Sequence, residues 1–168
     1  MGTKENLEAA FSGESQANRK YLAFAKKAEA EGFEQIAYLF RAIAEAETIH
    51  AHNHLRAMGK VGSTEENLKA AIQGEDYEYK DMYPEFLEVS EAEGETQAST
   101  GFRFAMEAEQ VHSTLYSEAL RDVKAGEDMP VHEVYLCEVC GHTVLGDPPE
   151  RCPICGSKQE KYFKVERN

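Results

Sequence analysis

The hexapeptide EAETIH at residues 45–50 decides the fold, because it returns as EAEQVH at residues 107–112. Each copy places a Glu-x-x-His pair on one face of a helix, one turn apart. Other strings recur at the same offset of 61 to 62 residues: Gly13-Glu14 as Gly74-Glu75, Tyr21 as Tyr83, and EAEG at residues 29–32 as EAEG at 91–94. Matches in register at one offset indicate a duplicated helical hairpin, and therefore a four-helix bundle.

Apolar residues at helical spacing predict the four helices of this bundle. The helices are expected to end near Gly32, Gly59, Gly94 and Gly126. Pro84 lies inside the third helix, where its missing N–H predicts a kink.

Composition limits the possible partners and locations. The chain has 168 residues, 42% of them hydrophobic, and a net charge of −13, which suits one or two small folded domains. This acidity argues against nucleic acid or an anionic membrane as the main partner, since both bind clustered Lys and Arg. The sequence contains neither a membrane-spanning run nor a secretory signal, so a cytoplasmic location is expected.

The cysteines divide the chain into two parts. All four lie in the last 32 residues, and this tail carries five acidic and five basic residues. The whole negative charge therefore belongs to the helical part, which predicts a bundle with its linker at residues 1–133 and a second domain at 134–168. Cysteines confined to one tail of a chain without a signal peptide favour a metal site over disulfides.

Four carboxylates occupy positions where the helices should be apolar: Glu14, Glu47, Glu75 and Glu109. A buried carboxylate is unfavourable by several kcal/mol unless it is neutralised, paired or bound to metal. In each hairpin the two glutamates lie 18 or 19 residues before and 15 residues after the turn glycine, and so at nearly the same depth.

Histidines complete this pattern. His50 and His112 lie one turn beyond Glu47 and Glu109, and Glu78 lies one turn beyond Glu75. One Glu from each of two helices with Glu-x-x-His from the other two is the ligand set of a carboxylate-bridged dimetal site, suited to iron or manganese. A buried salt-bridge network is the structural alternative, but no Lys or Arg lies on the stripes to supply it.

The tail contains two cysteine knuckles, Cys137-x-x-Cys140-Gly141 and Cys152-Pro153-x-Cys155-Gly156. Two such knuckles place four thiolates tetrahedrally around one metal ion. The spacing fits zinc and iron equally well, so the identity of the metal stays open at this point.

Together these motifs resemble the rubrerythrin family over nearly the whole chain. The resemblance implies a mainly α fold, with a ferritin-like four-helix bundle followed by a small rubredoxin-like β domain of the zinc-ribbon type. It also implies two non-haem iron ions in the carboxylate site and one iron ion in the four-cysteine site, which favours iron over zinc.

The resemblance assigns roles to the carboxylates. It implies that Glu47 and Glu109 bridge the two iron ions, while Glu14 and Glu75 are terminal ligands.

It likewise assigns His112 as a fixed ligand to one iron, while the second iron exchanges Glu78 for His50 on reduction. Tyr21 and Tyr83 match tyrosines that hydrogen-bond ligand carboxylates in this family, although core packing explains them equally well. The role of His54, one turn beyond His50, stays open.

The function implied is that of a non-haem peroxidase, which reduces hydrogen peroxide to water in oxidative-stress defence. Electrons would come from an external donor, a rubredoxin or an NAD(P)H-dependent reductase, through the thiolate-bound iron. A ferroxidase or iron-handling protein is the alternative, and a zinc-ribbon interaction protein would explain only the tail.

One feature of the chain departs from a ferritin-like bundle, which has a long crossover between its second and third helices. Here only residues 59–63 are available, and they reach at most about 18 Å. A helix of 25 residues is about 38 Å long. We therefore expect a homodimer in which two chains exchange their helical hairpins, with a monomeric up-down-up-down bundle as the alternative.

Overall fold

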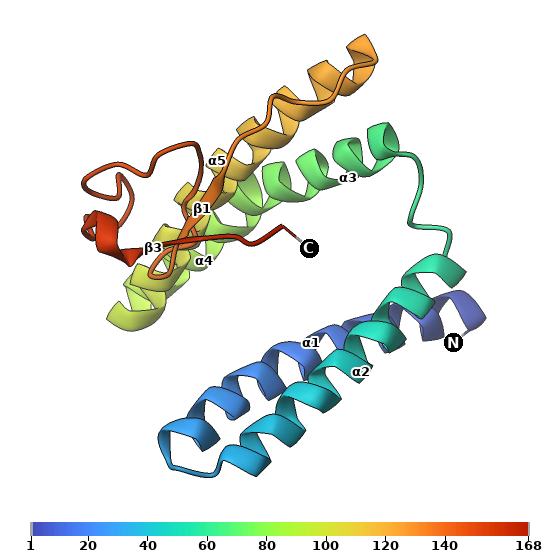
Figure 1. Cartoon of the computed structure of the whole chain (residues 1–168), viewed down its shortest axis with the longest axis vertical. Helices are drawn as coiled ribbons and strands as arrows, with labels where there is room; N and C mark the ends of the chain where they lie inside the picture. Colours follow the sequence, from blue (N-terminus) through green and yellow to red (C-terminus); the bar gives the residue numbers. More distant parts are fainter. Residues whose placement is uncertain (1, 168) are drawn as a thin grey trace. The chain divides into compact units, whose positions relative to one another are not determined.

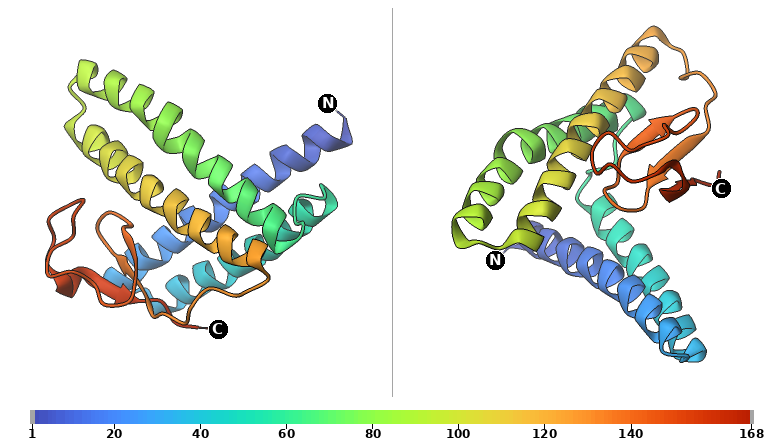
Figure 2. Two further views of the ribbon diagram at one scale, coloured as in Figure 1. Left: turned by 90° about the horizontal axis from the view of Figure 1, so that it is seen from above. Right: turned by 90° about the vertical axis from the view of Figure 1, so that its left-hand side faces the viewer.

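The computed structural model describes residues 2–167, which form two compact units, Met1–Gly62 and Ser63–Asn168. The N-terminal unit is a helical hairpin of α1 (Thr3–Ala30) and α2 (Glu34–Ala57), which lie side by side in every view (Figures 1 and 2). Gly32 lets the chain turn between them, because its φ of +83° is one that side chains disfavour.

Small residues form the contact between these two helices. Ala28 of α1 and Ala37, Ala44 and Ala51 of α2 are all buried. Three of these alanines are spaced seven residues apart along α2, so they form one seam along which the backbones can approach closely.

The C-terminal unit begins with a second hairpin. Its first arm consists of α3 (Thr64–Tyr77), η1 (Glu78–Met82) and α4 (Tyr83–Glu93), and its second arm is α5 (Thr96–Ala125). Both η1 and α4 contact α5, and the arms meet at small buried residues, where the hydroxyls of Ser90 and Ser99 lie 2.9 Å apart. Ser63 caps α3 by accepting a hydrogen bond from the backbone of Glu66.

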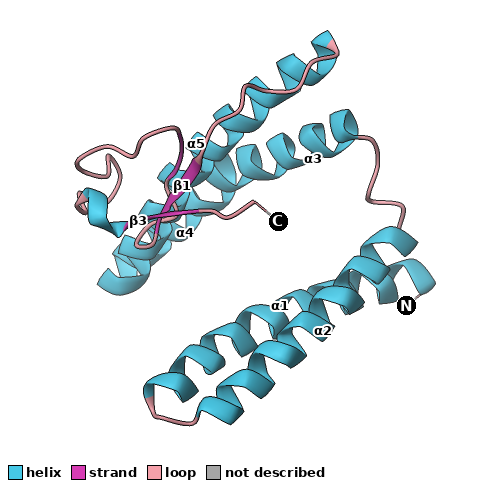
Figure 3. Cartoon of the chain, viewed as in Figure 1, coloured by secondary structure: helices cyan, strands magenta, loops and turns pink. Residues whose placement is uncertain are grey.

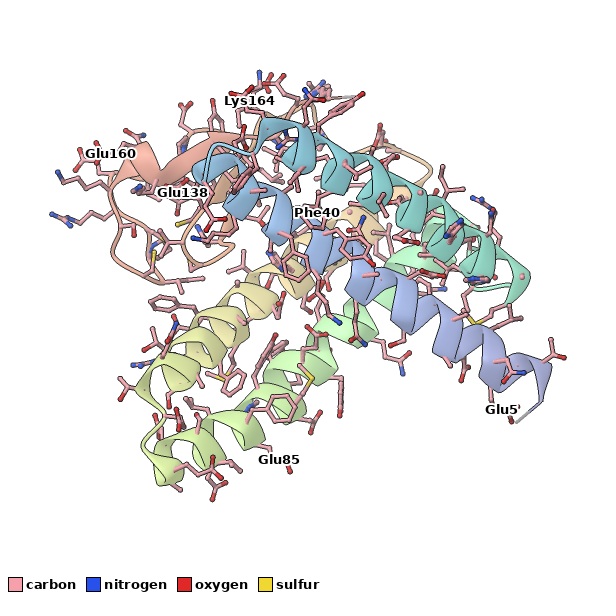
Figure 4. The ribbon with its side chains drawn as sticks, turned by 90° about the horizontal axis from the view of Figure 1, so that it is seen from below. Glu5, Phe40, Glu85, Glu138, Glu160 and Lys164 are labelled. Atoms are coloured by element: carbon pink, nitrogen blue, oxygen red, sulfur yellow. The ribbon has the colours of Figure 1, made fainter. Side chains whose placement is uncertain are left out.

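The structure shows the repeat directly in two aromatic clusters. Tyr21, Phe24 and Phe40 have ring centroids 5.7 to 6.3 Å apart, and Phe40 is labelled in Figure 4. The corresponding rings of the second hairpin are 5.6 to 6.3 Å apart: Tyr83, Phe86 and Phe102. The two hairpins therefore pack alike as well as matching in sequence.

The irregularity predicted at Pro84 takes a specific form. The helix forms a π-helical turn over Glu78–Met82, and the N–H of Tyr83 bonds to the carbonyl of Glu78. Pro84 lacks the N–H that would bond to the carbonyl of Lys80, and its ring would crowd that carbonyl in a regular α-helix. The widened turn places this disruption just before α4 rather than within it.

The remainder of the unit is the small β region drawn in magenta in Figure 3. Strands β1 (Val134–Cys137), β2 (Thr143–Leu145) and β3 (Tyr162–Lys164) form an antiparallel sheet in the order β2-β1-β3, with a short 3₁₀ helix, η2 (Gln159–Lys161), before β3. The buried core of this region contains Cys137, Cys152 and Tyr162.

Several large apolar side chains stay well exposed on each hairpin. Phe24, Ile36 and Ile43 of the N-terminal unit are 47%, 48% and 39% exposed, and Phe86 and Val89 of the C-terminal unit are 41% and 51% exposed. Alanine, serine and the two aromatic clusters make the contacts within a hairpin, while these larger apolar residues keep much of their surface exposed. Over the described part of the chain, no helix is long and apolar enough to cross a membrane.

Candidate metal centres

The N-terminal hairpin gathers three of the predicted ligands. Glu14 of α1 and Glu47 and His50 of α2 each offer a ligand atom within 4.8 Å of the others. His50 Nδ1 lies 2.9 Å from Glu47 Oε2, so the Glu-x-x-His spacing places both side chains at one point, as predicted. The His50 side chain is 53% exposed and that of Glu47 is 15% exposed.

The C-terminal hairpin gathers the equivalent set. Glu75 of α3 and Glu109 and His112 of α5 also offer ligand atoms within 4.8 Å of one another. His112 Nδ1 lies 2.6 Å from Glu109 Oε2 and 4.0 Å from Glu75 Oε2. These side chains are only 18% to 25% exposed, so His112 is better shielded from water than its counterpart His50.

Among the described residues, no Lys or Arg forms an ion pair with Glu14, Glu47, Glu75 or Glu109. The salt-bridge network considered as an alternative is therefore not formed. Each cluster combines two carboxylates and one imidazole, which are ligands that iron and manganese accept.

Glu78 lies beside the second cluster and has no carboxylate counterpart in the first hairpin, where the two offsets of the repeat place Ala17 or Gln16. It begins the π-helical turn, and its charge acts on Glu75. Burial raises the pKa of Glu78, and the nearby charge of Glu109 raises it further. The sequence placed Glu78 one turn beyond Glu75 but did not reveal the π turn directly; its signals were Pro84 and the change of the repeat offset from 61 residues at Glu75 to 62 at Tyr83.

The carboxylates of the second cluster lie close enough together to disfavour the ionisation of all of them at once. Burial, a hydrogen bond with Glu109 and the charge of Glu109 raise the pKa of Glu75 to about 7. The hydrogen bond between His112 and Glu109 lowers the pKa of Glu109 and raises that of His112. Protons are thus retained where carboxylates crowd together, and a bound metal ion would replace them. This donor set fits iron.

The second nitrogen of His112 reaches the β region of the same unit. Its Nε2 lies 2.9 Å from Thr143 Oγ1 and 3.3 Å from the carbonyl oxygen of Gly141. A hydrogen bond at the second nitrogen fixes the orientation of a ligating imidazole. Sequence analysis missed Thr143, because nothing in the order of residues indicates that β2 packs against α5.

Other predicted residues lie near the clusters without joining them. The charges of Glu78, Glu109 and Glu75 act on Tyr83, whose pKa is raised chiefly by burial. Within residues 2–167, neither Tyr21 nor Tyr83 has a hydrogen bond to a carboxylate, so that role stays a prediction. His54 is not among the clustered ligand atoms of the described residues.

The four cysteines form the third cluster. Their sulfurs all lie within 4.8 Å of one another, with Cys137 3.6 Å from Cys155 and Cys140 3.4 Å from Cys152. All four are free thiols, and their mutual distances agree with the predicted four-thiolate metal site. Gly141 has a φ of +80°, which the tight knuckle turn requires.

The environment of the cysteines affects how easily each thiol loses its proton to become a metal ligand. Burial raises the pKa of Cys140, and its sulfur neighbours raise it further. Burial would also raise the pKa of Cys152, but hydrogen bonds from the backbone of Cys155, the Tyr162 hydroxyl and the backbone of Ile154 lower it to about 6. The donors already point at sulfur, so this tetrahedral set fits one iron ion.

These features define a class of protein, one with a carboxylate dimetal site on repeated helical hairpins and a rubredoxin-like domain that follows. The family model for rubrerythrin matches residues 5–120, and the model for the rubredoxin-like domain of rubrerythrin matches residues 135–163. The chain belongs to the rubrerythrin family. Its cofactors are a non-haem di-iron pair in the carboxylate site and one iron ion in the four-cysteine site, and the predicted fold class is confirmed.

Several relatives cover nearly the whole chain. Rubrerythrin-2 of Clostridium acetobutylicum is 40% identical over 95% of both chains. Nigerythrin of Nitratidesulfovibrio vulgaris is 40% identical over 95% of this chain and 85% of its own. A solved structure of nigerythrin in a partially reduced state superposes with a TM-score of 0.58 at 36% identity, covering 98% of this chain and 88% of that one.

Proposed function

We propose that the protein is a di-iron peroxidase that reduces hydrogen peroxide to water. One observation carries this proposal: His112 connects the carboxylate cluster to the cysteine knuckle within a single unit. Its Nδ1 faces Glu109 at 2.6 Å, and its Nε2 faces the carbonyl of Gly141, the residue after Cys140, at 3.3 Å. A site that consumes two electrons therefore lies beside a one-electron centre that can refill it.

The ligand roles follow the family resemblance and the observed clusters. By the family resemblance Glu47 and Glu109 would be the bridging ligands, and each lies beside the histidine of its own motif. Glu14 and Glu75 are the terminal carboxylates from the neighbouring helices.

His112 is the fixed ligand at one iron, because Thr143 and Gly141 hold its ring. By the same resemblance Glu78 and His50 would be alternative ligands to the other iron. The π turn at Glu78 and the exposure of His50 favour such a movement, since neither side chain is held as His112 is.

When bound, the iron pair supplies the two electrons that, with two protons, convert one hydrogen peroxide into two waters. The chain supplies and positions the protons. Glu78 is suited to hold one at its carboxylate, because burial raises its pKa. The Tyr83 hydroxyl faces the same carboxylates and can hydrogen-bond an oxygen there.

A ferroxidase is the second candidate, since the same carboxylate clusters would serve it. The four-cysteine site favours the peroxidase, because iron storage does not need a dedicated one-electron relay. We propose that a rubredoxin or an NAD(P)H-dependent reductase delivers electrons to this relay. Free thiols persist in reducing compartments, which supports a cytoplasmic location.

The functional division we propose is a di-iron part at residues 1–133 and a relay domain at 134–168. The two family-model matches, residues 5–120 and 135–163, support it. The compact units instead divide at Gly62, because each contains one helical hairpin and the relay domain packs with the second. Each compact unit therefore carries only half of the proposed di-iron ligand set.

We also propose that two chains form a homodimer by exchanging hairpins, so that each di-iron site takes α1 and α2 from one chain and α3 to α5 from the other. The support is the short segment between Ala57 and Thr64, together with the exposed apolar residues on both hairpins. A four-helix core would cover those residues.

Stopped-flow mixing of the reduced protein with peroxide tests the peroxidase. We expect the iron to reoxidise much faster with peroxide than with oxygen, and Glu109→Ala to abolish turnover. Equal rates with both oxidants would favour the ferroxidase, and an active Glu109→Ala variant would overturn the ligand assignment.

Complementation tests the exchange. We expect Glu47→Ala and Glu109→Ala each to be inactive alone, whereas an exchanged heterodimer of the two contains one site with no substitution and one with both. A refolded equimolar mixture should then recover about a quarter of wild-type activity, because half of the dimers are mixed. Without exchange every site carries a substitution, so an inactive mixture that contains heterodimers would refute the proposal.

A further inference from the structure

A buried histidine and a buried tyrosine form a pair in the relay domain that the proposed ligand set does not use. His142 and Tyr162 are 8% and 9% exposed. His142 Nδ1 lies 2.7 Å from the Tyr162 hydroxyl, and the rings meet edge to face at 5.9 Å between centroids. Aliphatic residues could fill the same space without burying groups that need hydrogen bonds. Two polar side chains buried in so small a domain therefore suggest a role beyond packing.

The pair connects the two cysteine knuckles. The backbone N–H of His142 bonds to the sulfur of Cys140, and its carbonyl accepts from the backbone of Cys137 at 2.9 Å. Across the domain, Tyr162 and Cys152, a ligand from the second knuckle, belong to the same buried core, and the Tyr162 hydroxyl is near enough to that sulfur to affect its pKa. Tyr162 also pairs with Cys137 in the β1–β3 register, which fixes its backbone against the first knuckle.

The direction of these hydrogen bonds follows from counting protons. A metal-bound thiolate only accepts, so the single proton of the Tyr162 hydroxyl is donated to Cys152. The oxygen of Tyr162 must then accept from His142, which places the imidazole proton on Nδ1. The resulting chain of donors runs from His142 through Tyr162 to Cys152.

We propose that His142 and Tyr162 are positioning residues that aim a hydroxyl hydrogen bond at the Cys152 thiolate and thereby raise the reduction potential of the four-thiolate iron. Tyr162 makes the bond to sulfur, and His142 holds the hydroxyl in the orientation that makes it.

The physical basis is the charge change on reduction. One electron from the external donor converts the ferric site, with a net charge of −1, into the ferrous site, with a net charge of −2. The extra charge spreads onto the sulfurs, so a hydrogen-bond donor stabilises the reduced form more than the oxidised form. The Tyr162 proton stays on its oxygen in both states, and no other group changes. A higher potential eases electron uptake from the donor and reduces the driving force for transfer to the di-iron site.

Tyr162→Phe in the full-length, iron-loaded protein tests this proposal. The variant removes one hydroxyl and keeps the ring, and we expect the midpoint potential of the ferric thiolate absorption to fall in a spectroelectrochemical titration. The sulfur-to-iron charge-transfer band should also shift to lower energy. The matched control is Tyr135→Phe, which removes a hydroxyl from the same sheet. That hydroxyl has no hydrogen bond among the described residues, so neither readout should change.

His142→Phe separates the two roles. It removes the donor to Tyr162 but keeps a ring in the same place, so we expect a smaller fall in potential. Because His142 acts through Tyr162, the double variant should match Tyr162→Phe alone. A midpoint potential and absorption spectrum of Tyr162→Phe equal to those of the wild type would overturn the proposal.

A measurement on the unmutated chain covers the case in which Tyr162→Phe does not take up iron. Protein loaded with ¹¹³Cd should show a slowly exchanging Tyr162 hydroxyl proton that correlates with cadmium through the hydrogen bond to sulfur. Absence of this correlation, with the backbone amide correlations present, would equally overturn the proposal. The inference rests on the four-cysteine iron alone, and no peroxide enters either experiment, so it can fail independently of the peroxidase.

Discussion

Replacing Glu75 with glutamine tests the electrostatics of the carboxylate cluster in the metal-free protein. Burial and the neighbouring Glu109 raise the pKa of Glu75 from 4.5 to about 7, so its carboxyl stays neutral and hydrogen-bonded to Glu109 at mildly acid pH. Glutamine reproduces that neutral, hydrogen-bonding form at every pH. The variant should therefore be more stable than the wild type only at pH values above the pKa of the unfolded state. There the wild-type carboxyl must either take up a proton on folding or be ionised in the folded protein.

The sign and size follow from linkage. Below pH 4.5 the carboxyl is protonated in both the folded and unfolded states and does not affect stability. Between pH 4.5 and 7 it ionises only in the unfolded state, so the free energy of unfolding falls as the pH rises. The full rise in pKa corresponds to about 3 kcal/mol. Because a fifth of the side chain is open to water, we expect about 2 kcal/mol above pH 7.

The assay is urea unfolding of chelator-treated protein, followed by the helical circular dichroism signal between pH 5 and 8. The difference in the free energy of unfolding, Glu75→Gln minus wild type, should increase with pH and become constant near pH 8. Effects of Glu109 and His112 are common to both proteins and largely cancel. The control is Glu85→Gln, at an exposed position on α4 labelled in Figure 4, and its difference should stay within about 0.5 kcal/mol. A stability difference for Glu75→Gln that does not change with pH would refute the reasoning.

Three further outcomes are expected. Thr143→Val is nearly isosteric but removes a hydrogen-bond partner of His112 Nε2. The affinity of the carboxylate site for Fe²⁺ or Mn²⁺, measured by calorimetric titration, should therefore fall about 10- to 100-fold. An unchanged affinity would contradict the role of Thr143 in positioning His112. Ala37→Leu places three extra carbons in a fully buried seam and should lower the free energy of unfolding by about 1 to 3 kcal/mol, whereas Ala9→Leu on an exposed position of α1 should change it little. Removal of iron should abolish amide exchange protection in residues 134–164 while the helices keep theirs, and re-addition of iron should restore it, because so small a core depends on its metal; protection that survives without metal would show the core to be sufficient.

Much of the architecture could be predicted because the relevant signals are local or repeated. The periodicity and the turn glycines predicted the helices, and the offset of EAETIH and EAEQVH predicted the duplication that the matching aromatic clusters now show. The cysteine knuckles predicted a four-thiolate cluster because spacing alone brings their sulfurs together. The three residues of each carboxylate cluster could be predicted for the same reason, since helix geometry determines which residues share a face.

What could not be predicted depends on contacts between distant segments. Pro84 indicated a disruption, but only the packing of the first arm on α5 decides that it becomes a π turn beginning at Glu78. Helical spacing predicted which apolar residues share one face of a helix, but not which residues form the contact between the arms of a hairpin. Packing shows that alanine and serine form the seams within the hairpins, because small residues let helices approach more closely than Phe or Ile would.

The sequence by itself therefore determined the class of fold and the ligand types, since hydrogen bonding along a helix and the spacing of a knuckle are short-range. Only the tertiary structure decided that Thr143 and Gly141 hold His112, and that Tyr162 joins His142 to Cys152. Those contacts join residues 10 to 31 positions apart or bring one strand against a helix. Their geometry arises from the packing of complete helices and strands against one another, and such packing produces no repeating pattern in the sequence.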